Sequence, residues 1–198
     1  MGLDLGSVPV RLDSAPLRVL RDSAEAWEEA ILHPPFSTGD HGPRPAVSRD
    51  LLELLPEGFD RGWHFQTRGH EQAEYLIDPP GFRRIRTWEE RERSLPYRTV
   101  HGDRPFAEHA RGGQGIPWRC STSGFLAEAA ARIDAIDAET ARREFSVADM
   151  VDQGVYKAVQ VSADEDEAFV DVLADLRRLA RWYHRVVDAG LDLIVIVD

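Results

Sequence analysis

The chain has 198 residues, of which 42% are hydrophobic and 30% are charged, and its formal net charge at pH 7 is -11. This length suits one domain with a sizeable buried core. The acidic balance excludes a general nucleic-acid binder, because such proteins neutralise phosphates with an excess of basic side chains. The sequence has no basic segment followed by an apolar run and no membrane span, so we expect a cytoplasmic location and no membrane partner.

Charge is distributed unevenly along the chain. Residues 81–119 carry a net charge of +4, whereas residues 1–80 carry -7 and residues 120–198 carry -8. The middle of the chain is also rich in glycine and proline, which are typical of turns and loops. We therefore predict a single domain over 1–198 that contains a long irregular segment at about 78–119.

The first predicted element is a strand near the N-terminus. Val8, Val10 and Leu12 alternate with other residues as they would in a half-buried strand. Pro9 favours an edge position, because proline cannot donate a hydrogen bond to a neighbouring strand.

A helix follows this strand. Ser14 is a candidate N-cap, and apolar residues recur at helical spacing from there to Ile31. The composition then predicts a loop over residues 36–48, and the apolar stretch 51–55 predicts a short helical turn.

The last third of the chain has the clearest pattern. The expected elements are a helix after Thr122 or Ser123, a short helix from Asp137 to about Phe145, a turn after Ser146, a helix over 165–189 that ends before Gly190, and a strand over 191–197. The long helix has one apolar stripe, and the final strand is apolar enough to be buried on both faces. The predicted fold class is α+β, a small mixed sheet with a buried C-terminal strand packed by amphipathic helices.

Three stretches of this C-terminal third also carry a family resemblance. They are the helix and turns of residues 126–146, the pair Val155-Tyr156, and the helix containing Trp182-Tyr183 with the strand that follows it. They resemble the YfbM-like family, small bacterial proteins that share a domain of unknown function, best over 122–198. Lys157 stands where the family has proline. The resemblance implies an α+β fold with a buried C-terminal strand, and it implies no reaction.

Upstream, a segment with Trp63 and His64 is similar to the tryptophan–histidine segment of the family. With His70 and Glu71 it offers two imidazoles and a carboxylate, which are zinc-ligand types. A spacing of six residues does not bring these ligands together, and the alternative places Trp63 in the core with His64 on a backbone carbonyl. We therefore expect no metal and no cofactor.

Cys120 precedes a predicted helix, where the helix dipole lowers the pKa of a thiol. A nucleophilic role would pair it with His64, His101 or His109 as the base, and the sequence does not choose among these histidines. The alternative is a small packing residue, which is the usual role of a lone cysteine.

The basic cluster is the most distinctive candidate surface. Arg83, Arg84 and Arg86 precede Trp88, and arginine with tryptophan is typical of binding hot spots. The alternative is a solvated face, in which the glutamates interleaved over residues 89–92 pair with these arginines.

Two hypotheses follow. The first is a non-enzymatic binding module that recognises a protein partner through residues 60–119, with a toxin-neutralising immunity protein as a specific version, because loops on rigid supports often carry function. The second is a small-molecule enzyme that uses these histidines with Glu71, Asp103 or Glu108 as acid–base pairs. We favour the first, and the oligomeric state stays open.

Overall fold

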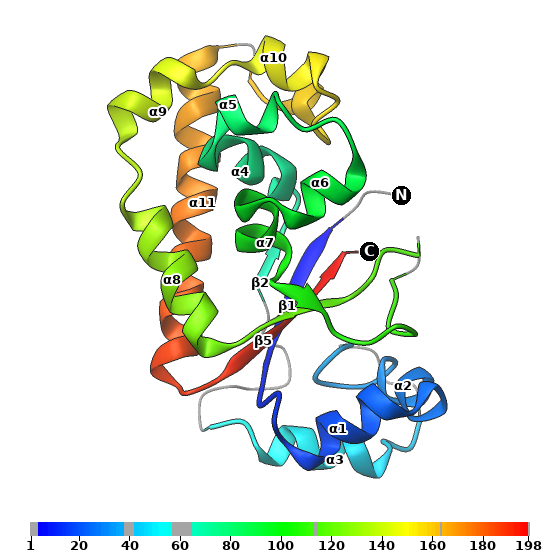
Figure 1. Cartoon of the computed structure of the whole chain (residues 1–198). Coiled ribbons are helices and arrows are strands. Elements are labelled where there is room, and N and C mark those ends of the chain that lie inside the picture. Colours follow the sequence, from blue (N-terminus) through cyan, green and yellow to red (C-terminus); the bar gives the residue numbers. More distant parts are fainter. Residues whose placement is uncertain (1–3, 38–41, 57–64, 113–114, 163, 198) are drawn as a thin grey trace.

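A five-stranded sheet crosses the middle of the molecule in the strand order β2-β1-β5-β4-β3 (Figure 1). The structure, a computed structural model, describes residues 4–37, 42–56, 65–112, 115–162 and 164–197. The strands are β1 (Leu5–Val10), β2 (Phe65–Thr67), β3 (Arg104–Pro105), β4 (Arg119–Ser121) and β5 (Asp192–Val197). Helices accompany the sheet, which confirms the α+β class. The four pairings between these strands are all antiparallel, so the expectation of a mixed sheet is wrong.

The C-terminal strand β5 lies at the centre of the sheet and is buried on both faces, as predicted. Leu193 and Val195 belong to the core on one face, and Ile194 and Ile196 belong to the core on the other. Successive side chains of a strand point to opposite faces of the sheet. Because helices pack on both faces, the side chains of β5 are buried on each side, and the strand does not alternate between apolar and polar residues.

Strand β1 differs from its prediction in two ways. It lies between β2 and β5 rather than at an edge, and five of its six residues are buried. Pro9 is tolerated inside the sheet because β2 pairs only with residues 5–7 of β1. In the described part of the chain, Pro9 therefore has a strand neighbour on one side only.

Three helices cover one face of the sheet (Figure 1). They are α1 (Ala15–Asp22), α2 (Ala24–Ala30) and α3 (Ala46–Glu53). The single helix predicted from Ser14 to Ile31 is two helices, because the backbone of Ser23 is extended and its side chain accepts a hydrogen bond from Ala26 N at 3.2 Å. Helix α3 begins earlier than the predicted turn at 51–55, inside the segment predicted as a loop.

The remaining helices lie on the other side of the sheet, and some of them pack directly against its strands (Figure 1). They are α4 (His70–Ile77), α5 (Pro79–Phe82), α6 (Trp88–Arg93), α7 (Leu95–His101), α8 (Ser123–Asp134), α9 (Ala138–Glu144), α10 (Val147–Asp152), η1 (Ala158–Gln160, a 3-10 helix) and α11 (Glu165–Asp188). The helices predicted in the last third are confirmed, with their N-caps at Thr122, Asp137 and Ser146. Gly190, after α11, has a φ of +66°, the left-handed conformation that glycine adopts without strain. Among the described residues, no helix has the length and apolarity needed to cross a membrane.

The irregular segment predicted over 78–119 is wrong for its first half, which forms α5, α6 and α7. Three prolines that favoured a loop, Pro79, Pro80 and Pro96, occupy the first turns of α5 and α7, where proline removes no helical hydrogen bond. Helix α6 begins with a capping box between Thr87 and Glu90. Within 102–112 and 115–118, the regular structure consists of the short strand β3 and an isolated bridge.

Candidate functional site

The arginine-rich segment is fixed to the interior through helix α4. Glu74 on α4 is completely buried, and its carboxylate accepts hydrogen bonds from Arg91 of α6, at 3.0 Å from Nε to Oε1 and 2.7 Å from Nη2 to Oε2. Arg91 Nη2 also lies 3.0 Å from Glu71 Oε1. Paired hydrogen bonds of this kind offset the large cost of burying a carboxylate.

His101 of α7 completes this buried group. Its Nε2 lies 3.3 Å from Glu74 Oε2, and its ring stacks on Tyr97 with a centroid distance of 4.3 Å. Burial alone would raise the pKa of Glu74, but the nearby His101 ring and the hydrogen bonds from Arg91 outweigh it and hold this pKa below its usual value. We call Glu74, Arg91 and His101 the Glu74 cluster. It joins α4, α6 and α7 into one unit.

Arg83 also forms hydrogen bonds with other parts of the protein. Its Nε donates to Asp149 Oδ2 at 2.6 Å, and the Tyr75 hydroxyl donates to the same oxygen at 2.5 Å. Burial, together with this hydrogen bond to Asp149, raises the pKa of Tyr75 to about 12. Arg83 therefore holds α5 against α10, although the sequence suggested a binding residue.

The other residues of the predicted binding surface are exposed. Trp88 is 48% exposed, and α6 has no buried residue. Arg84, Arg86 and Arg93 are exposed too, and Leu95 is 40% exposed. We call residues 84–95 the Trp88 segment. Within the described ranges, Arg84 and Arg93 form no hydrogen bond or ion pair, and Arg86 Nη1 donates to the carbonyl of Arg83 at 2.7 Å.

The interleaved glutamates do not neutralise these exposed arginine side chains. Glu90 Oε2 accepts from the backbone N–H groups of Arg86 and Thr87, at 2.8 and 3.2 Å. Glu92 Oε1 lies 3.5 Å from Nη1 of the buried Arg119. The self-paired face that the sequence offered as an alternative is therefore not the arrangement around Arg84 and Arg93.

Among the described candidates, the two histidines lie on opposite faces of the sheet. His109 Nε2 lies 2.9 Å from the carbonyl oxygen of Leu20, on the α1–α3 face, whereas His101 lies in the Glu74 cluster on the opposite face. Cys120 is buried in β4, and burial raises the pKa of its thiol, contrary to the effect of a helix start. Trp63 and His64 lie outside the described residues.

The acidic partners proposed for these histidines are engaged elsewhere. Glu71 pairs with Arg91, and Asp103 pairs with Arg98. His70 begins α4 and is buried, with its ring 5.1 Å from that of His101. In the part of the chain that the structure describes, no group of three or more histidine, cysteine or acidic residues is arranged to hold a metal.

Comparisons with known proteins agree with this fold. The family model of a domain of unknown function, DUF1877, matches residues 85–196, which is more than half of the chain. The chain therefore belongs to this family of uncharacterised domains. The match begins upstream of the stretch 122–198 where the motifs are clearest, so α6 and α7 are part of the family pattern.

A solved structure identifies the fold more specifically as YfbM-like. The crystal structure of a protein of unknown function, YfbM from Escherichia coli, covers 100% of both chains with a TM-score of 0.62 and 13% sequence identity. At that identity the likeness shows the fold alone. A search of curated proteins finds no significant match.

Proposed function

We propose that this domain is a binding module, not an enzyme, and that it recognises a protein partner through the Trp88 segment. The observation that carries the proposal is an exposed tryptophan, 48% accessible, close in sequence to Arg84, Arg86 and Arg93, which form no ion pair within the described part of the chain. Tryptophan and arginine are the residues that most often supply binding energy at interfaces. The Glu74 cluster beneath supplies a rigid support.

The charge of this segment favours an acidic surface on the partner. Arg84, Arg86 and Arg93 are exposed, whereas the carboxylates of Glu90 and Glu92 are engaged. An immunity-type antagonist of a basic toxin would instead use the acidic remainder of the chain, so the Trp88 segment gives no support to that version. Complementary charge speeds association and selects partners.

The enzyme hypothesis has no comparable support. His101 and His109 lie on opposite faces of the sheet, so they do not act on one substrate. His101 is only 4% exposed and is enclosed by Glu74 and Tyr97, away from bulk solvent.

Site-specific cross-linking in the native cell tests the proposal. A photo-reactive phenylalanine analogue in place of Trp88 is expected to cross-link one protein in good yield. The same analogue in place of Val170, which is 60% exposed on α11, serves as the control and is expected to give none. Equal cross-linking from both positions, or none from position 88, contradicts the proposal.

A further inference from the structure

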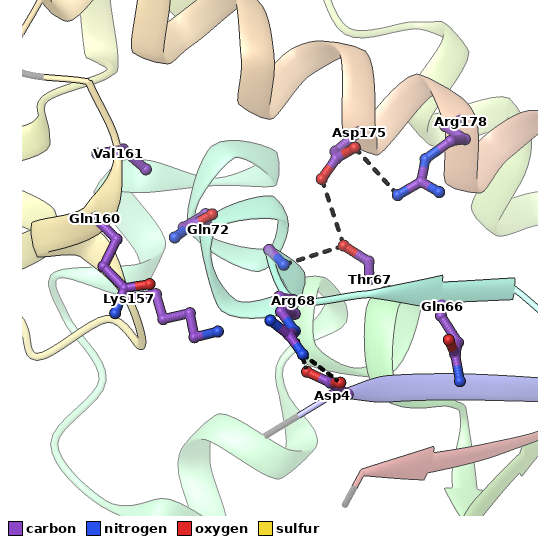
Figure 2. A pocket seen from close by; sticks show the side chains of 11 residues that line it. Asp4, Gln66, Thr67, Arg68, Gln72, Lys157, Gln160, Val161, Asp175 and Arg178 are labelled. Atoms are coloured by element: carbon purple, nitrogen blue, oxygen red, sulfur yellow. Dashed lines mark hydrogen bonds and ion pairs between the residues drawn. The ribbon is translucent and has the colours of Figure 1, made fainter. Parts of the chain in front are cut away.

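A polar pocket of about 440 Å³ lies away from the residues considered above (Figure 2). Its walls come from the end of β2 and the start of α4, from the connection that contains η1, and from α11. Most of its lining side chains are charged or carry amide groups. Its volume is in the range of small-molecule sites.

The lining of the pocket carries more positive than negative side chains. Arg68 is held by Asp4, with 2.8 Å between Nε and Oδ1, and Arg178 is held by Asp175 at 3.2 Å. Lys157, the only lysine of the chain, extends from the opposite wall toward Arg68 (Figure 2). Within the described ranges Lys157 has no ion-pair partner, so one positive charge remains unmatched in the pocket.

The backbone conformation of Lys157 supports a functional role for its side chain in this pocket. Its φ of 58° is the only left-handed value among the described residues other than glycine. Such a conformation costs about 1 kcal/mol or more in a residue with a side chain, and it is frequent at functional sites.

The other side of the pocket presents acceptors. Gln72 is 8% exposed, and its Nε2 donates to the carbonyl of Tyr156 at 3.2 Å, which turns Oε1 toward Gly69. A methyl group at Gly69 would lie 3.0 Å from Gln72 Oε1 and 3.2 Å from Asp175 Oδ2. The two oxygens therefore converge on the space that glycine leaves open. Asp175 Oδ2 accepts one hydrogen bond, from Thr67 Oγ1 at 3.4 Å, and no donor among the described residues bonds Gln72 Oε1.

We propose that this pocket binds a small zwitterion, a molecule that carries one carboxylate and one ammonium group. Lys157 and Arg68 bind the carboxylate, and Gln72 Oε1 with Asp175 Oδ2 accepts hydrogen bonds from the ammonium group. A simple anion leaves Gln72 Oε1 without a donor, and a simple amine leaves Lys157 without an opposite charge. This site is independent of the Trp88 segment.

Titration by nuclear magnetic resonance with defined probes tests the proposal. Glycine, γ-aminobutyrate and ε-aminocaproate are compared with butyrate and butylamine, which carry one charge each. At least one zwitterion is expected to bind about tenfold more tightly than both single-charge probes, with shifts at Gly69 and Gln72. No binding, or equal binding of butyrate, overturns the proposal.

Variants locate the two ends of the ligand. Lys157→Gln is expected to lower the affinity for the zwitterion to that for butylamine. Asp175→Asn is expected to lower it to that for butyrate. Arg143→Gln removes one charge from the exposed face of α9 and is the matched control, with no expected effect. If Lys157→Gln binds the zwitterion as tightly as Arg143→Gln does, and its spectrum remains that of the folded protein, the assignment of Lys157 to the carboxylate is wrong.

Discussion

Arg91 and Glu74 connect helix α6, which lies on the surface, to the interior of the protein. Arg91 Nη2 lies 2.7 Å from Glu74 Oε2, the glutamate side chain is completely buried, and α6 has no buried residue. The Trp88 ring contacts the buried Tyr97 ring at a centroid distance of 5.6 Å, and α6 otherwise contributes little apolar packing to the Trp88 segment. Its position depends on an ion pair that reaches below the surface.

Arg91→Leu is expected to destabilise the protein strongly. It leaves a buried carboxylate with one partner fewer, and removing one member of a buried pair costs about 3–5 kcal/mol. Urea unfolding followed by tryptophan fluorescence measures the loss. Arg143→Leu breaks an exposed pair with Glu139 on α9 and is expected to change stability by about 0.5 kcal/mol or less. A similar loss for both variants would contradict the role given to Arg91.

Because of the Glu74 cluster, we also expect the free energy of unfolding to depend on pH in the acid range. Because the pKa of Glu74 is lowered in the folded protein, its contribution is complete above the usual value of 4.5 and is lost as the pH falls through the folded pKa. Unfolding measured at a series of pH values is expected to show this loss in the wild type and a flatter dependence in Glu74→Gln. Glu128→Gln, on the exposed face of α8, is the control and should leave the profile unchanged.

The ionisation of Tyr75 and Tyr97 is expected to lower the stability of the protein at alkaline pH. Each has its pKa raised from 10.0 to about 12, chiefly by burial, so the folded state disfavours their ionisation. Their contribution is complete below pH 10 and is lost as the pH rises toward about 12. Tyr75→Phe is expected to reduce this alkaline loss, as measured by unfolding across that range. An unchanged slope would show that the burial of Tyr75 does not control its ionisation.

Cys120 is expected to react slowly in the folded protein. The thiol is buried and its pKa is raised, and the thiolate is the reactive form. Alkylation by iodoacetamide at neutral pH should be slow in buffer and fast in urea. Modification as fast in buffer as in urea would restore the nucleophile hypothesis.

The sequence predicted the C-terminal half of the fold well, because its signals are local. Asp137 and Ser146 cap helices within their own turns, and Gly190 ends α11 where the apolar stripe stops. The helices over 79–101 were missed because proline was taken as a loop signal, whereas Pro79 and Pro96 lie at helix starts.

The candidate site was predicted only in part. Arg84, Arg86 and Trp88 are exposed as a binding surface requires, but the internal role of Arg83 depends on Asp149, which is distant in the sequence. The burial of Glu74 had no sequence signal, since a glutamate in a mixed helical segment is usually solvated. Contacts between distant segments, which local patterns do not encode, account for both failures.

Native mass spectrometry of the chain purified from its own cells, as wild type and as Trp88→Ala, tests the central claim most directly. The account predicts that the wild type carries one acidic protein in stoichiometric amount, that Trp88→Ala loses it, and that Val170→Ala keeps it. A wild-type chain that is recovered without a partner, or a partner that Trp88→Ala retains, would contradict the assignment of this domain as a binding module acting through the Trp88 segment.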